Sequence, residues 1–144
     1  MNSSALLSGM ALVALLSAPA FGHIGENFQQ CFDRYGRKII EEKKLGLLDQ
    51  ITFQSDDLTV TALFVDGKAE YLTFEKEGRL SDIEVSHLLT KNSVDSLLTQ
   101  ESRRPMQVGD KVLDEVTWTS LENIAVLNAT RNSLVVYTKR LADQ

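Results

Sequence analysis

The stretch that decides the fold reads LTVTALFV from Leu58 to Val65, then Asp66-Gly67, then KAEYLTFE from Lys68 to Glu75. Both runs are rich in the β-branched and aromatic residues that strands prefer. Asp-Gly between two such runs favours a type I′ turn, because both central residues of that turn need a positive φ. The stretch therefore predicts a β-hairpin with one mainly apolar face, built from the cross-strand pairs Phe64–Ala69, Ala62–Tyr71 and Val60–Thr73.

The residues before the hairpin predict one helix and one further strand. Four side chains recur at the i, i+3, i+4, i+7 spacing of a single helical face: Phe28, Cys31, Phe32 and Tyr35. An amphipathic helix is expected over Glu26–Tyr35, with Gly36 as its stop signal. Asp49–Phe53 alternates as a half-buried strand does. The intervening Arg37–Leu48 is expected to be variable, with a short strand at Ile39-Ile40.

The residues after the hairpin predict a second helix and more strands. Ser81-Asp82-Ile83-Glu84 matches a capping box, in which the Ser hydroxyl and the Glu carboxylate each bond to the other's backbone N–H. The helix is expected to reach about Thr90, and a short helical turn to follow over Asn92–Leu98. Gln100–Asp114 is polar and is expected to be the longest loop. Three short strands should follow: Glu115–Ser120, Ile124–Thr130 and Leu134–Thr138.

This order of elements predicts an α+β fold. It reads as two units, each a helix plus a three-strand meander, with the helices packed on one antiparallel sheet. The predicted fold occupies residues 23–144 as a single domain, which suits the length of the chain.

The first residues differ from this body. Met1–Gly22 contains no charged side chain, and Ala5–Leu16 is an apolar run about as long as the core of a secretory signal. A membrane-spanning helix would need about 20 such residues. Residues 1–22 are therefore expected to be a signal peptide, cleaved after Ala20 or Gly22, with no membrane anchor afterwards. The expected location is secreted or periplasmic.

The single cysteine, Cys31, stands too far from the apolar run to carry a lipid, so lipidation is not expected. One cysteine cannot form an internal disulfide, which leaves a buried thiol, a free thiol or a bridge between chains. Its place on the apolar helix face favours burial.

The charge and the motifs exclude several function classes. The net charge is −5, which gives no electrostatic reason to bind nucleic acid. The basic pairs Lys43-Lys44, Arg103-Arg104 and Lys139-Arg140 are expected to be solvated surface. The sequence contains no Gly-x-Ser-x-Gly elbow and no glycine-rich phosphate loop, so no catalytic residue and no cofactor is predicted.

Neither histidine belongs to a strong metal motif. Glu84 and His87 form a lone Glu-x-x-His pair, which is a weak signal. His23 is a conditional option: if cleavage follows Gly22, its free amine and imidazole could together chelate Cu²⁺. Asn128-Ala129-Thr130 matches a glycosylation sequon, but it falls within a predicted strand.

Several motifs resemble a group of small uncharacterised secreted bacterial proteins. The similar segments are Ile24-Gly25-Glu26, Cys31, Arg34-Tyr35-Gly36, Phe64–Ala69, Leu80–Glu84, Leu88-Leu89 and Asn92-Ser93. The order of elements is also similar to the fold of secreted β-lactamase inhibitor proteins and to small lipoproteins of outer-membrane assembly. The chain departs from the group at Arg37-Lys38, where a proline is common, and from the lipoproteins by lacking their lipid-bearing cysteine.

Those resemblances imply binding or scaffolding rather than catalysis. The expected function is a non-enzymatic secreted or periplasmic binding or scaffolding domain, whose partner is another envelope or extracellular protein. Two alternatives stay open at this point. One is a copper- or small-ligand-binding protein that uses His23, and the other is a secreted hydrolase with an unrecognised motif.

Overall fold

A computed structural model describes residues 23–35, 39–92, 94 and 99–144. The elements in chain order are α1 (Phe28–Tyr35), β1 (Ile39–Leu45), β2 (Leu48–Ser55), β3 (Leu58–Val65), β4 (Lys68–Lys76), α2 (Asp82–Lys91), β5 (Gln100–Val108), β6 (Lys111–Thr119), β7 (Asn123–Leu127), β8 (Ser133–Thr138) and α3 (Lys139–Ala142).

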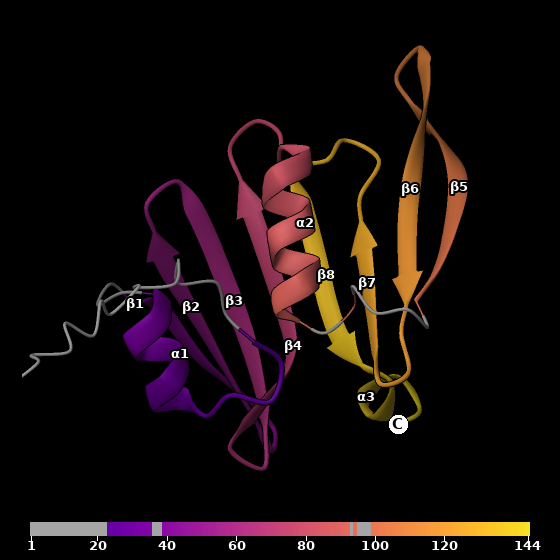
Figure 1. Cartoon of the computed structure of the whole chain (residues 1–144). Coiled ribbons are helices and arrows are strands. Elements are labelled where there is room, and N and C mark those ends of the chain that lie inside the picture. Colours follow the sequence, from indigo (N-terminus) through magenta and orange to yellow (C-terminus); the bar gives the residue numbers. More distant parts are fainter. Residues whose placement is uncertain (1–22, 36–38, 93, 95–98) are drawn as a thin grey trace, which may run out of the picture.

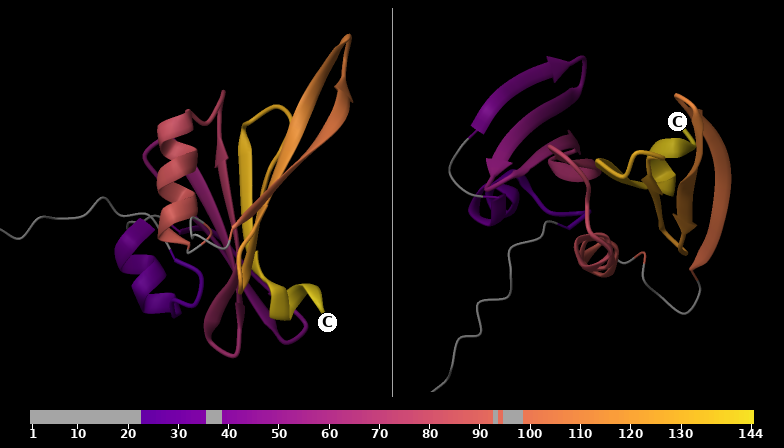
Figure 2. Two further views of the ribbon diagram at one scale, coloured as in Figure 1. Left: turned by 45° about the vertical axis from the view of Figure 1, so that its right-hand side comes forward. Right: turned by 90° about the horizontal axis from the view of Figure 1, so that it is seen from above.

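The eight strands form one antiparallel sheet in the order β1-β2-β3-β4-β8-β7-β6-β5 (Figure 1). Each half is a meander in which consecutive strands are neighbours, and the two halves join where β4 pairs with β8. The strands β1 and β5 are the two edges. Figure 2 shows α1 and α2 on one face of the sheet, α3 at the end of the opposite face, and the β5–β6 hairpin projecting beyond the other strands.

The predicted fold class is wrong. The structure is mostly one eight-stranded antiparallel sheet with three small helices, and it does not divide into two units of a helix plus three strands. Each half of the sheet contributes four strands, because two segments without an apolar pattern are strands as well.

The first of those segments is Gln100–Asp114, which is not a loop. It forms β5, the turn that follows it and the first four residues of β6, Lys111–Asp114. Its residues are polar because most of their side chains are exposed on both faces of the projecting hairpin. The second segment lies within Arg37–Leu48, where the strand reaches from Ile39 to Leu45. A strand that is exposed to solvent on both faces does not show the alternation of apolar and polar residues by which strands are recognised in a sequence.

The central hairpin is confirmed, but its predicted register holds only near the turn. Asp66 and Gly67 have φ of 50° and 75°, as a type I′ turn requires. Phe64 faces Ala69 as expected, whereas Ala62 faces Leu72 and Val60 faces Phe74. The register shifts by one residue between Leu63 and Phe64, which is a β-bulge. A one-residue shift exchanges the two faces of a strand, so Leu72 and Phe74 enter the core in place of Tyr71 and Thr73.

The capping box of α2 is confirmed. The Ser81 hydroxyl accepts from the Glu84 N–H at 3.2 Å, and the Glu84 carboxylate accepts from the Ser81 N–H at 2.7 Å. The flanking Leu80 and Val85 are both buried. The Ile83 side chain in the same turn is exposed, so it adds nothing to the core.

The core lies between the sheet and the two helices α1 and α2. Tyr35 of α1 contacts Phe53 of β2, with ring centroids 5.6 Å apart. The predicted helix face is confirmed in part, since Cys31 and Tyr35 are buried while Phe28 is exposed. Such ring pairs add to the stabilisation from burial alone, by about 0.5–1.5 kcal/mol each.

Two predictions fall outside the described residues. They concern the signal peptide over residues 1–22 and most of the helical turn after Asn92. Among the helices that the structure does describe, none has the length and hydropathy to cross a bilayer.

Candidate functional site

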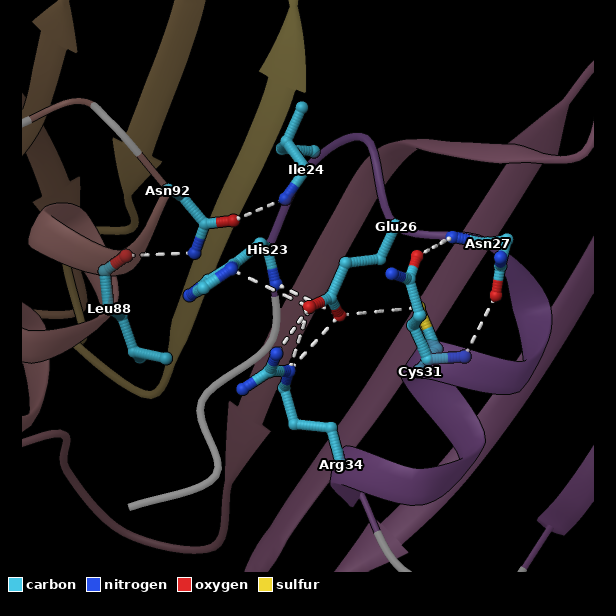
Figure 3. Close-up of polar contacts among 9 residues, drawn as sticks. His23, Ile24, Glu26, Asn27, Cys31, Arg34, Leu88 and Asn92 are labelled. Atoms are coloured by element: carbon cyan, nitrogen blue, oxygen red, sulfur yellow. Dashed lines mark hydrogen bonds and ion pairs between the residues drawn. The ribbon is translucent and has the colours of Figure 1, made fainter. Parts of the chain in front are cut away.

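A polar cluster surrounds Glu26, just before α1 (Figure 3). Arg34, on the last turn of α1, donates from Nε and Nη2 to Glu26 Oε1 at 2.9 and 2.5 Å. The Glu26 side chain is only 9% exposed, so its charge depends on this cation for compensation. His23 approaches the same carboxylate, with its backbone N 3.4 Å from Oε2 and its Nδ1 3.5 Å from Oε1.

The electrostatics of this cluster disfavour the protonated form of His23. Partial burial and the positive charge of Arg34 lower the pKa of His23, and the attraction of Glu26 offsets this only in part. The ring atom Nε2 is buried without a hydrogen-bond partner in the described structure. If His23 were the first residue, its α-amine, its imidazole and the Glu26 carboxylate would be three possible metal-binding groups close together. The Glu26 carboxylate, however, is already bound by Arg34.

Cys31 closes the cluster on the side of α1, with Sγ 3.9 Å from Glu26 Oε2. Burial, together with the negative charge of Glu26, raises the pKa of Cys31 to about 12. The side chain is fully buried and forms no disulfide. The thiolate is the form of cysteine that acts as a nucleophile or a metal ligand, and the raised pKa leaves almost none of it. Cys31 is therefore a core residue, as its position on the helix predicted.

The two histidines are not joined into one metal site. Across the ranges that the structure describes, no three His, Cys, Asp or Glu side chains are grouped as metal ligands. His23 lies beside Glu26, and His87 is on the exposed side of α2. Copper binding by an N-terminal His23 therefore stays a prediction.

Asn92 connects the same cluster to the second helix and the sheet. Its Oδ1 accepts from the Ile24 N–H, and its Nδ2 donates to the Leu88 carbonyl, both at 2.8 Å. Its own carbonyl accepts from Nδ2 of Asn123 on β7, also at 2.8 Å. Asn92 is almost completely buried, and every one of these contacts is intramolecular. Through Asn92, the cluster therefore holds the segment around Ile24 against the end of α2 and against β7.

A groove of about 580 Å³ lies on the helix side of the sheet, between α1 and the β1–β2 hairpin. Its apolar surface comes from Phe28 of α1, Ile51 of β2 and Phe64 of β3. Charged residues of β1 form its rim: Glu42, Lys43 and Lys44. We call this the α1–β1 groove. An apolar surface with a few charges around it is the usual composition of a binding site.

The two elements that border the α1–β1 groove carry exposed apolar side chains. Phe28 is 39% exposed, Ile40 48%, Leu45 47% and Leu47 100%. All of them belong to α1 or to the β1–β2 hairpin. Single exposed apolar residues need no explanation, but four on α1 and one hairpin, of which Phe28 also lines the groove, indicate an interaction surface.

A second hollow lies between α2 and the β5–β6 hairpin. Two adjoining pockets of about 290 and 390 Å³ share Arg103, Val116 and Arg131. The arginines are already paired, Arg131 with Asp82 at 2.5 Å and Arg103 with Glu101 at 2.8 Å. This hollow therefore offers little free charge to a ligand.

Other polar motifs are part of the surface. Arg104 pairs with Glu115, and Lys43 with Glu41. Arg140 binds the buried carboxylate of Glu70. Asn128 follows β7 in a turn rather than lying in a strand, so its predicted position was wrong, and its side chain binds the turn backbone at Asn132.

Sequence reasoning missed the α1–β1 groove. The sequence pattern places Phe28 on the apolar face of a helix, and Ile51 and Phe64 on strand faces, which gives no sign that they meet around a hollow. The one available signal was the Leu45-Gly46-Leu47-Leu48 stretch, whose apolar residues surround a turn glycine at the tip of a charged strand.

Comparison with known proteins adds no relative: no family model, no curated protein and no solved structure matches this chain.

Proposed function

We propose that the protein is a non-enzymatic binding or scaffolding domain that acts outside the cytoplasm, after export, on another envelope or extracellular protein. The observation that carries the proposal is the α1–β1 groove, with Phe28 exposed on its wall and Leu45 and Leu47 exposed at the adjoining hairpin tip. Apolar anchors that enter a hollow are the usual centre of a protein–protein interface.

The chemistry of the groove specifies what it would accept. The walls are aromatic and aliphatic, and the rim carries Glu42 and Asp49 as well as Lys43 and Lys44. Mixed rim charges do not select a strongly charged ligand. The fitting partner presents one or two apolar side chains flanked by polar residues of both signs.

The other polar cluster supports binding rather than catalysis. Cys31 is held as a protonated thiol, and Glu26 is engaged by Arg34. These groups therefore stabilise the fold, and the groove is left as the surface with capacity for a partner.

The test is a photo-crosslinking residue placed at Gln50, which lines the groove, in the full chain expressed in its host. We expect one discrete protein adduct, and we expect Phe28→Glu to abolish it because the change puts a charge on the apolar wall. The matched control is Ile83→Glu, at an apolar residue of α2 that is exposed and outside the groove. An adduct that survives Phe28→Glu, or the absence of any adduct, contradicts the proposal.

A further inference from the structure

The edge strand β1 has a charge order that complements itself. It reads Ile39-Ile-Glu-Glu-Lys-Lys-Leu45, and no strand of the described sheet lies on its outer side. Edge strands are usually kept from pairing by lysines, prolines or bulges. The other edge, β5, contains Pro105 and two adjacent arginines. β1 also contains two lysines and an irregularity near its start, but two acids precede the two bases, so an antiparallel copy brings opposite charges together.

The backbone of β1 presents the matching hydrogen-bonding groups. Leu45 pairs with Leu48 across the two-residue connection at Gly46-Leu47. In such a hairpin the flanking pair exchanges both backbone bonds, and bonded pairs then alternate along the strands. The main-chain groups of Lys43 therefore face β2, and those of Glu42 and Lys44 face the free edge.

The side chains of Glu42 and Lys44 are also the ones on β1 that can form new ion pairs. Glu42 forms no ion pair within the described chain, and Lys44 has only a loose contact with Asp49 at 3.9 Å. Lys43 is held by Glu41 at 2.8 Å on the opposite face of the strand.

We propose that β1 pairs antiparallel with β1 of a second copy, about a two-fold axis at Lys43, so that Glu42 of each copy lies opposite Lys44 of the other. Residues opposite each other in antiparallel strands lie on the same face of the sheet, and this register meets that condition. It gives two ion pairs and uses only the strand beyond the irregularity at Ile39–Glu41. The two facing Lys43 side chains are each balanced by their own Glu41.

The dimer is closed, because it uses up the β1 edges and leaves only the β5 edges, where Pro105 opposes further pairing. It also places the two α1–β1 grooves side by side, since Glu42 and Lys44 belong to the rim of each. The inference goes beyond the proposed function and does not require that the groove has a ligand.

The test is analytical ultracentrifugation of the exported protein from about 10 µM to about 1 mM, a range suited to a small interface. The wild-type chain should dimerise reversibly. Glu42→Lys alone and Lys44→Glu alone should each weaken dimerisation by about tenfold or more, because each places like charges opposite one another. Lys111→Glu, at the start of β6, is the control and should change nothing.

Two recovery experiments separate pairing from general damage. An equimolar mixture of the Glu42→Lys and Lys44→Glu chains should form a heterodimer, because each chain then carries one sign of charge. The double variant with both changes should again form a homodimer. A wild-type chain that stays monomeric over the whole range, or a dimer that neither single change weakens, overturns the inference. Both results concern the purified chain alone, so they are distinct from failure of the crosslinking test.

Discussion

The side chain of Asn92 accepts a hydrogen bond from the backbone N–H of Ile24, 68 positions earlier in the chain, at 2.8 Å. The same amide donates to the Leu88 carbonyl and so also closes the end of α2. A single buried side chain therefore fastens the segment before α1 to the helix that joins the two halves of the sheet.

Asn92→Ala should destabilise the protein by about 1–3 kcal/mol, because it leaves the part-buried N–H of Ile24 without its partner and removes the side-chain bond to the Leu88 carbonyl, which then keeps only the backbone N–H of residue 92. Denaturant unfolding followed by circular dichroism measures the loss. Gln107→Ala is the comparison, since Gln107 makes a similar amide contact with Gly109 on an exposed turn. Its effect should be below about 0.5 kcal/mol. Equal effects of the two changes would refute the role given to Asn92.

Cys31 should be inert in the folded protein. Burial and a pKa raised to about 12 leave almost no thiolate at pH 8. We expect a thiol reagent to modify the native protein only at the rate of unfolding, and to react at once in denaturant. A non-reducing gel should show no disulfide-linked dimer. Rapid stoichiometric labelling of the native state would show that the α1 cluster is open.

The buried carboxylate of Glu70 should make stability depend on acid pH. Burial opposes its ionisation, but hydrogen bonds from Thr138 and Arg140 outweigh that effect and lower the pKa of Glu70 below 4.5. A lowered carboxyl pKa stabilises the fold above pH 4.5, and this stabilisation is lost as the pH falls through the folded pKa.

Glu70→Gln should therefore cost about 1–2 kcal/mol at pH 7 and progressively less as the pH falls below 4.5. Thermal unfolding across this pH range gives the difference at each pH. Glu77→Gln, at an exposed position, serves as the control. A cost for Glu70→Gln that does not change with pH would contradict this assignment.

If export removes residues 1–22, His23 becomes the first residue of the mature chain. Its backbone N lies 3.4 Å from Glu26 Oε2, so the new α-ammonium group would gain an ion pair with Glu26. Cleavage after Ala20 would leave the charge two residues away. We therefore expect the intact mass of the exported protein to correspond to a start at His23. A start at Phe21, or retention of Met1, would refute this assignment.

Local signals explain what could be predicted from the sequence. The turn at Asp66-Gly67 and the capping box of Ser81 and Glu84 each depend on residues within one turn of each other. Backbone preferences and short-range hydrogen bonds decide such features before any tertiary contact forms.

The bulge in β4 could not be predicted in this way. Glu70 is buried beside the shift in register, where it binds Thr138 and Arg140, 68 and 70 positions later. These contacts exist only after β8 has paired with β4. The predicted pairs of Ala62 and Val60 were therefore each wrong by one residue.

The polar hairpin of β5 and β6 was missed for a different reason. Its outer half projects into solvent (Figure 2), so the alternation of polar and apolar residues on which strand prediction relies is absent. The α1–β1 groove depends on the same missing information, since its rim comes from β1, the other exposed edge strand.

The most direct test of the central claim is hydrogen–deuterium exchange of the protein with and without the partner identified by crosslinking at Gln50. The account predicts that binding slows exchange in residues 39–55 and around Phe28, and leaves residues 100–119 of the β5–β6 hairpin unchanged. Protection confined to the β5–β6 hairpin, with none at β1 and α1, would contradict it.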